Sequence, residues 1–83
     1  MKVNIKYFAS IRETIGHGNA LHNTSATTLA GLRDELLALS PAHADGLARG
    51  KVVRMALNQV MRDESAALTD GCEVGFFPPV TGG

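Results

Sequence analysis

A stripe of leucines is the feature that most limits how this chain can fold. The stripe consists of Leu29, Leu32, Leu36 and Leu39. These positions recur at i, i+3, i+7 and i+10, which places their side chains on one face of an α-helix. Thr28 can cap the start of this helix, and Pro41 is expected to stop it. One main helix with one apolar face must pack against something else in the chain.

The remaining apolar segments predict a sheet as the partner of that helix. In residues 2–8, Val3, Ile5 and Tyr7 share one face at period two, which is typical of a half-buried strand. The other expected strands are residues 20–23, 52–57, 60–61 and 73–77. Residues 9–15 predict a short helical segment before a turn at residues 16–19, and residues 41–50 are expected to form a loop.

The order of these elements predicts an α+β fold with one helix on one face of a mixed sheet. Two strands precede the helix and the others follow it, an order that resembles the ubiquitin-like β-grasp. Pro78 and Pro79 cannot donate to a strand ladder and end the last strand. We therefore expect a domain over residues 1–79 and an extended tail over residues 80–83.

Composition excludes several classes of protein. Eight basic and eight acidic residues cancel, whereas nucleic-acid binding needs a basic surface. A single cysteine cannot form an internal disulfide. No apolar run approaches the roughly 20 residues of a membrane span, and residues 1–8 do not have the pattern of a signal peptide. We expect a cytoplasmic protein that binds neither nucleic acid nor membrane.

Two glycines, Gly82 and Gly83, follow the prolines at the end of the sequence. A terminal carboxylate becomes a good acyl donor once it is joined to AMP, and that reaction requires the tail to enter a narrow channel of another protein. Glycine has no Cβ to widen the tail or to restrict φ. The ending therefore indicates a C-terminus that is itself the reactive group.

Several motifs together resemble one family, the small subunits of molybdopterin synthase, which are ubiquitin-related sulfur carriers. The motifs are Tyr7-Phe8-Ala9, Arg12-Glu13, Leu57-Asn58-Gln59, Leu68-Thr69-Asp70-Gly71, Glu73-Val74 and residues 76–83. The resemblance spans the chain, and the last eight residues are its most specific part. Cys72 stands where the family often carries Asp.

The resemblance implies a function for the tail. An adenylating enzyme of the ubiquitin-activating type would consume ATP to activate Gly83, next to Gly82, and the product would become a thiocarboxylate. The inserted segment would be Pro78, Pro79, Val80 and Thr81. Within a heterotetramer with the large subunit, the tail would give its sulfur to cyclic pyranopterin monophosphate. The chain would then be a sulfur-donor subunit without a bound cofactor, a metal or activity of its own.

Phe8 and Phe77 predict where the partner docks. If Tyr7 and Phe76 face the helix, strand alternation places Phe8 and Phe77 on the opposite face. The first and last strands are parallel neighbours in a β-grasp, so both rings would emerge together. Met61 is a possible third member of this surface.

Other residue types give weaker signals. Cys72 is expected to be structural, and His17, His22 and His43 lack metal-ligand spacing, so we expect surface residues. Three alternative functions remain open: a sulfur carrier for thiamine or tRNA thiolation, a ubiquitin-like protein modifier, and a binding module with an inert tail.

Overall fold

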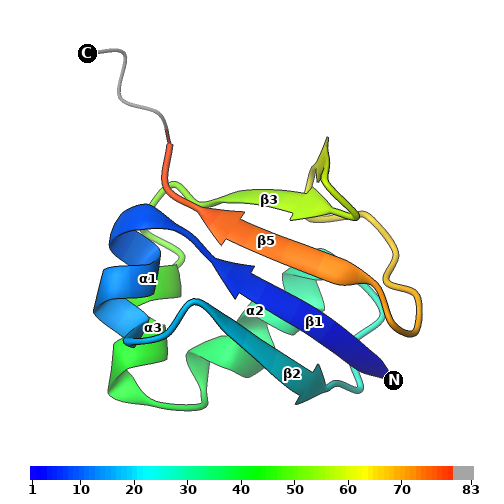
Figure 1. Cartoon of the computed structure of the whole chain (residues 1–83), viewed down its shortest axis with the longest axis horizontal. Helices are drawn as coiled ribbons and strands as arrows, with labels where there is room; N and C mark the ends of the chain where they lie inside the picture. The colour runs from blue at the N-terminus through cyan, green and yellow to red at the C-terminus, as the bar shows by residue number, and fades with distance from the viewer. Residues whose placement is uncertain (80–83) are drawn as a thin grey trace.

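Five strands form one mixed sheet, and three helices pack against one of its faces (Figure 1). The computed structural model describes residues 1–79. The strands are β1 (Lys2–Tyr7), β2 (Asn19–Asn23), β3 (Arg54–Leu57), β4 (Val60–Arg62) and β5 (Glu73–Phe77). The helices are α1 (Ala9–Ile15), α2 (Leu29–Leu37) and α3 (Pro41–Leu47). The spatial order is β2-β1-β5-β3-β4, in which only β1 and β5 pair in parallel.

The core lies between the sheet and the helices. On β1 the alternation of exposed and buried residues is complete, and Val3, Ile5 and Tyr7 are buried. Phe76 of β5 stacks beside Tyr7, with ring centroids 6.0 Å apart. Within the described residues the opposite face of the sheet carries no helix, and we call it the open face. This architecture confirms the predicted α+β, β-grasp fold.

Local signals in the sequence explain several element boundaries. The Thr28 hydroxyl accepts a hydrogen bond from the Gly31 N–H at 3.2 Å and caps α2, as predicted. Asn58 and Gln59 both have positive φ, at 50° and 69°, which suits a two-residue hairpin turn between β3 and β4. Gly16 ends α1 in the left-handed conformation at φ 100°.

The prediction of a loop over residues 41–50 is wrong, because residues 41–47 form α3. Pro41 stands at the first turn of this helix, where a missing N–H costs nothing. The Ser40 hydroxyl caps the helix by accepting from the His43 N–H at 3.2 Å. Pro41 therefore starts a helix, whereas α2 already ends at Leu37, before this proline is reached. Leu39 is also outside α2, which ends at Leu37.

The predicted strand over residues 52–57 is two residues too long. The first residue of β3 is Arg54, which lies opposite Phe77 on β5. Val52 and Val53 would have to pair with the residues after Phe77, which are Pro78 and Pro79. Prolines have no N–H to donate, so pairing stops with Phe77.

Arg33 lies off the leucine stripe, yet it is only 5% exposed. Its guanidinium donates to the carbonyl oxygens of Leu47, Ala48 and Lys51, and it forms an ion pair with Glu64 at 3.1 Å. These bonds hold the chain between α3 and β3 against α2. Spacing alone does not reveal this role, because all the backbone acceptors are distant in sequence.

Replacing Arg33 with Met is expected to destabilise the fold by about 2–4 kcal/mol, since buried carbonyl oxygens lose charged donors. Urea unfolding measures this loss. Arg62→Met is the matched control, because Arg62 is exposed and its side chain makes no hydrogen bond or ion pair within residues 1–79. Its effect should stay within about 0.5 kcal/mol. Equal stabilities of the two variants would contradict the role of Arg33.

The lowered pKa of Glu35 predicts how the stability of the fold depends on pH. Hydrogen bonds from Thr24 at 2.6 Å, then from His22 and Ser25, lower the pKa of Glu35 from 4.5 to about 2. Because the folded-state pKa is lower than the unfolded one, this stabilisation is complete above pH 4.5 and is lost as the pH falls toward 2. Glu35→Gln should therefore be destabilised at pH 7 and lose less stability on acidification than the wild type. Denaturant titrations at several pH values test this, with exposed Glu13→Gln as the control.

Within residues 1–79, none of the helices is long and apolar enough to cross a bilayer.

Candidate functional site

The junction between β1 and α1 directs Phe8 onto the open face. Phe8 still has the extended backbone of a strand, with φ and ψ of −123° and 152°. Its N–H donates to the carbonyl oxygen of Phe76 at 3.0 Å. Ala9 then turns the chain sharply, with a positive φ of 51°. A positive φ is uncommon for any residue other than glycine. As a result the Phe8 ring is 45% exposed, although Tyr7 before it is buried.

Phe77 meets Phe8 on the open face. The two rings pack edge to face, with centroids 6.0 Å apart and planes at 85°. This is a preferred geometry for aromatic pairs. Gly75 provides the space beneath them, because a Cβ at this position would lie 3.2 Å from a ring carbon of Phe8. The missing side chain lets the Phe8 ring lie close over β5.

Ala56 and Met61 continue this apolar surface across β3 and β4. Strand register places Ala56 opposite Gly75 on one side and opposite Met61 on the other. Met61 is 51% exposed. We call the group Phe8, Ala56, Met61, Gly75 and Phe77 the apolar patch. The structure thus places the three predicted docking residues on one face, while their role in docking stays a prediction.

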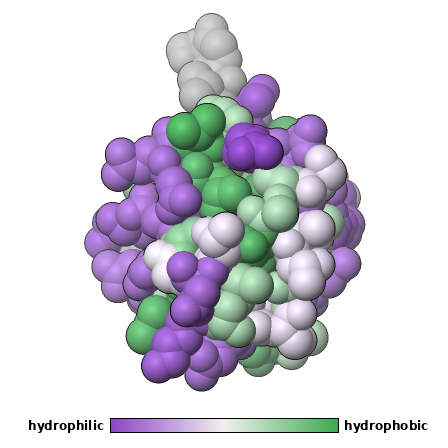
Figure 2. Space-filling view, turned by 90° about the vertical axis from the view of Figure 1, so that its right-hand side faces the viewer, coloured by the Kyte–Doolittle hydropathy of each residue, from purple (hydrophilic) through white to green (hydrophobic). Residues whose placement is uncertain are grey.

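Apolar residues are also exposed on another side of the molecule. Figure 2 shows them as a band with hydrophilic residues on its left and mostly residues of intermediate hydropathy on its right. An exposed apolar patch with a polar border is typical of a protein interaction site.

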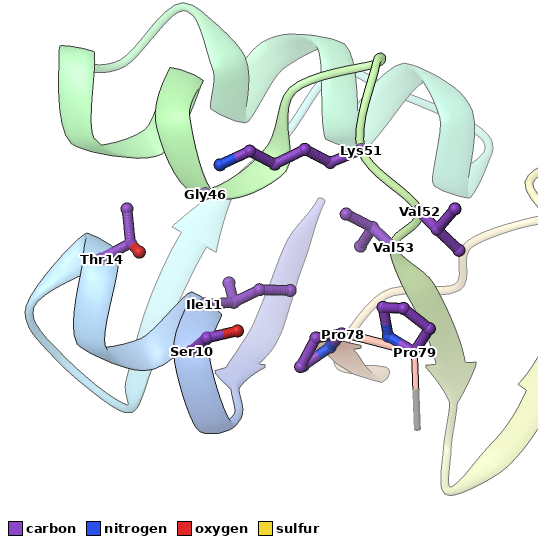
Figure 3. A pocket seen from close by; sticks show the side chains of 9 residues that line it. All are labelled: Ser10, Ile11, Thr14, Gly46, Lys51, Val52, Val53, Pro78 and Pro79. Carbon is purple, nitrogen blue, oxygen red and sulfur yellow. The ribbon is translucent and has the colours of Figure 1, made fainter. Parts of the chain in front are cut away.

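Pro78 and Pro79 lie at the edge of a hollow of about 360 Å³ (Figure 3). The hollow is bounded by α1, by the end of α3 and by the segment before β3. The Lys51 side chain extends over it toward α3, where its ammonium donates to the Asp45 carbonyl oxygen at 2.7 Å. The root of the tail, Pro78 and Pro79, directly follows Phe77 of the apolar patch at the end of β5.

The remaining predicted site residues, Val80, Thr81, Gly82 and Gly83, lie outside the described residues. The predicted division into a domain over 1–79 and a tail over 80–83 therefore stays a prediction. Residues 1–79 contain no group of three or more His, Cys, Asp or Glu side chains that could hold a metal ion.

The histidines and the cysteine have structural contacts. Cys72 is buried in the core, which agrees with a structural role. His17 is exposed, but His43 is partly buried, and its ring stands 6.1 Å from that of Tyr7, so the expectation of surface residues is only partly right. Burial, followed by the nearby charges of His17 and His22, lowers the pKa of His43. Burial also raises the pKa of Tyr7 to about 12.

Sequence reasoning missed Gly75 and Ala56 as members of the patch. Alternation along β5 puts Gly75 on the same face as Phe77, and the register of β3 against β5 would have revealed Ala56. Arg54, opposite Phe77, was missed for the same reason.

Comparison with known proteins gives the family. The ThiS family model matches residues 5–83. The molybdopterin synthase sulfur carrier subunit of Escherichia coli K12 is 38% identical over 81 residues, which cover 98% of this chain and 99% of that protein.

Solved structures agree with this result. A chain from the complex of subunits 1 and 2 of the molybdopterin-converting factor of Helicobacter pylori 26695 has a TM-score of 0.71 and 28% identity, with full coverage of both chains. SAMP1 of Haloferax volcanii has a TM-score of 0.80 with full coverage, but at 23% identity it supports the fold alone. The chain belongs to the ThiS family, and it resembles the molybdopterin synthase sulfur carrier subunits along its whole length.

Proposed function

We propose that this protein is the sulfur carrier subunit of a molybdopterin synthase, and that Gly83 carries the sulfur. The observation that carries the proposal is the position of the apolar patch beside the root of a tail that ends in Gly82-Gly83. A carrier of this kind needs a surface that docks and an end that reaches into its partner. The curated relatives named as sulfur carrier subunits support the same assignment.

Activation of Gly83 requires a partner enzyme and ATP. The Gly83 carboxylate attacks the α-phosphorus of ATP, which releases pyrophosphate and leaves an acyl-adenylate. A persulfide sulfur on a donor protein then attacks the acyl carbon and displaces AMP. A second thiol cleaves the sulfur–sulfur bond, which leaves a thiocarboxylate on Gly83 and a disulfide on the donor.

Sulfur transfer would take place inside the large subunit. The thiocarboxylate sulfur attacks a carbon of cyclic pyranopterin monophosphate and displaces the oxygen bound there, which leaves with a proton from the large subunit. Water then cleaves the resulting thioester link. The sulfur stays on the pterin and Gly83 returns to a carboxylate. In this scheme the carrier contributes the reactive end group and the docking surface, while the large subunit supplies the acid and base groups.

Intact-mass measurement tests the proposal. The protein is incubated with an adenylating enzyme of the ubiquitin-activating type, ATP and a persulfide donor. We expect its mass to rise by the difference between sulfur and oxygen, and this change should require ATP. No mass change, or isopeptide adducts on lysines without a thiocarboxylate, would contradict the sulfur-carrier assignment.

A further inference from the structure

A charged residue stands in the same row as the two phenylalanines. Arg54 of β3 lies opposite Phe77 of β5, and strand alternation directs its side chain to the open face, since Met55 after it is buried. Across the open face, one row therefore reads Phe8, Phe77 and Arg54. The next row contains the rest of the apolar patch together with Lys6, which lies opposite Gly75.

Several other cations within residues 1–79 already have partners. The Lys6 ammonium lies 3.5 Å from the Glu73 carboxylate, and the Lys51 ammonium donates to a backbone oxygen. Arg33 and Arg49 bind carboxylates beside α2. Arg54 is exposed, and within residues 1–79 its side chain forms neither an ion pair nor a hydrogen bond. Its guanidinium has five N–H donors available.

A protein that covers Phe77 must also remove water from part of the Arg54 guanidinium. Burying a charge without an opposite charge is costly. A carboxylate offsets that cost best, because its two oxygens match the planar fork of a guanidinium. The charge of Arg54 therefore favours partners that place a carboxylate opposite it and disfavours partners that do not.

We propose that Arg54 is a specificity-determining residue of the docking surface and that the large subunit presents an Asp or Glu carboxylate to it. This inference rests on the proposed function, because it assigns the apolar patch to the large subunit. It adds a charge requirement that the apolar patch alone does not impose.

Binding measurements with purified large subunit test the inference. Arg54→Glu should weaken the complex at least about tenfold, because it sets two carboxylates against each other. Arg54→Gln should weaken it less, and its complex should be less sensitive to added salt than that of the wild type. Arg62→Glu is the matched control. It changes the net charge equally, but Arg62 lies opposite Met55 and so faces away from the open face.

The possible outcomes separate the two proposals. A loss with Arg54→Glu that greatly exceeds that with Arg62→Glu supports the inference, as does recovery of binding when one acidic residue of the large subunit is changed to Arg. Equal affinities of the two variants would overturn it and leave the sulfur-carrier proposal intact. If the wild-type protein forms no complex with the large subunit, both proposals fail. Circular dichroism of each variant checks that the fold is unchanged.

Discussion

Deletion of Gly83 is expected to reduce sulfur transfer at least about a hundredfold and to leave the fold unchanged. Without this residue the terminal carboxyl group stands about 3.5 Å short of its position in the complete chain. A misplacement of about 1 Å at reacting atoms can already cost about a hundredfold in rate. The core cluster ends at Phe76, so thermal unfolding should be that of the wild type. Dithiolene formation in a reconstituted synthase assay gives the rate.

Gly82→Val tests the same mechanism without shortening the chain. A β-branched side chain widens the tail and restricts its φ, so activation and transfer should both fall. Gly50→Val is the matched control. A Cβ at Gly50 would meet no atom within 4 Å, so its side chain should be tolerated. Full activity of either the Gly83 deletion or Gly82→Val would contradict a reactive, inserted C-terminus.

Much of this fold could be predicted because its patterns are local. Val3, Ile5 and Tyr7 mark the buried face of β1 by alternation alone, and that alternation also placed Phe8 correctly on the open face. The α2 stripe is similarly clear, although Leu39 proved to be exposed beyond the end of the helix. In each case the signal needs only a few neighbouring residues.

Features that depend on distant partners could not be predicted. α3 has seven residues and only one large apolar side chain, Leu47, so periodicity cannot identify it. Gly46 of α3 is buried and packs closely against α1, where a Cβ would lie 3.1 Å from the Ile15 side chain. The start of β3 depends on where β5 stops pairing, and the burial of Arg33 depends on acceptors more than ten residues away.

The candidate site shows the same difference between features set by local patterns and features set by distant partners. Strand alternation gives the face of Phe77 and of Gly75 two residues before it, but only the register between strands shows that Ala56 and Arg54 lie beside them. Register depends on the length of the connections between strands, and here Asn58 and Glu73, whose backbones are hydrogen-bonded, are 15 positions apart in the sequence. No local pattern fixes such a long connection.

Phe77→Asp is expected to weaken binding of the large subunit at least about a hundredfold while the isolated domain stays folded. Burial of a phenylalanine side chain contributes about 1.5–3 kcal/mol, and a carboxylate in the same place adds a desolvation cost and can pair with Arg54 opposite it, which takes that guanidinium from the partner. Together these exceed the 2.8 kcal/mol that correspond to about a hundredfold in Kd. Phe77 is only partly buried and lies outside the core cluster, so stability should change little. Titration calorimetry measures the affinity.

Substitutions at two other positions serve as controls for this experiment. Phe76→Asp should unfold the isolated domain, because the Phe76 side chain is fully buried in the core. Leu21→Asp also places a carboxylate on an exposed side chain of the open face, but on the edge strand β2, away from the apolar patch. Its complex with the large subunit should keep an affinity close to that of the wild type. If Leu21→Asp and Phe77→Asp weaken binding equally, the partner covers the whole open face rather than the apolar patch. If Phe77→Asp binds as tightly as the wild type, the apolar patch is not the docking surface.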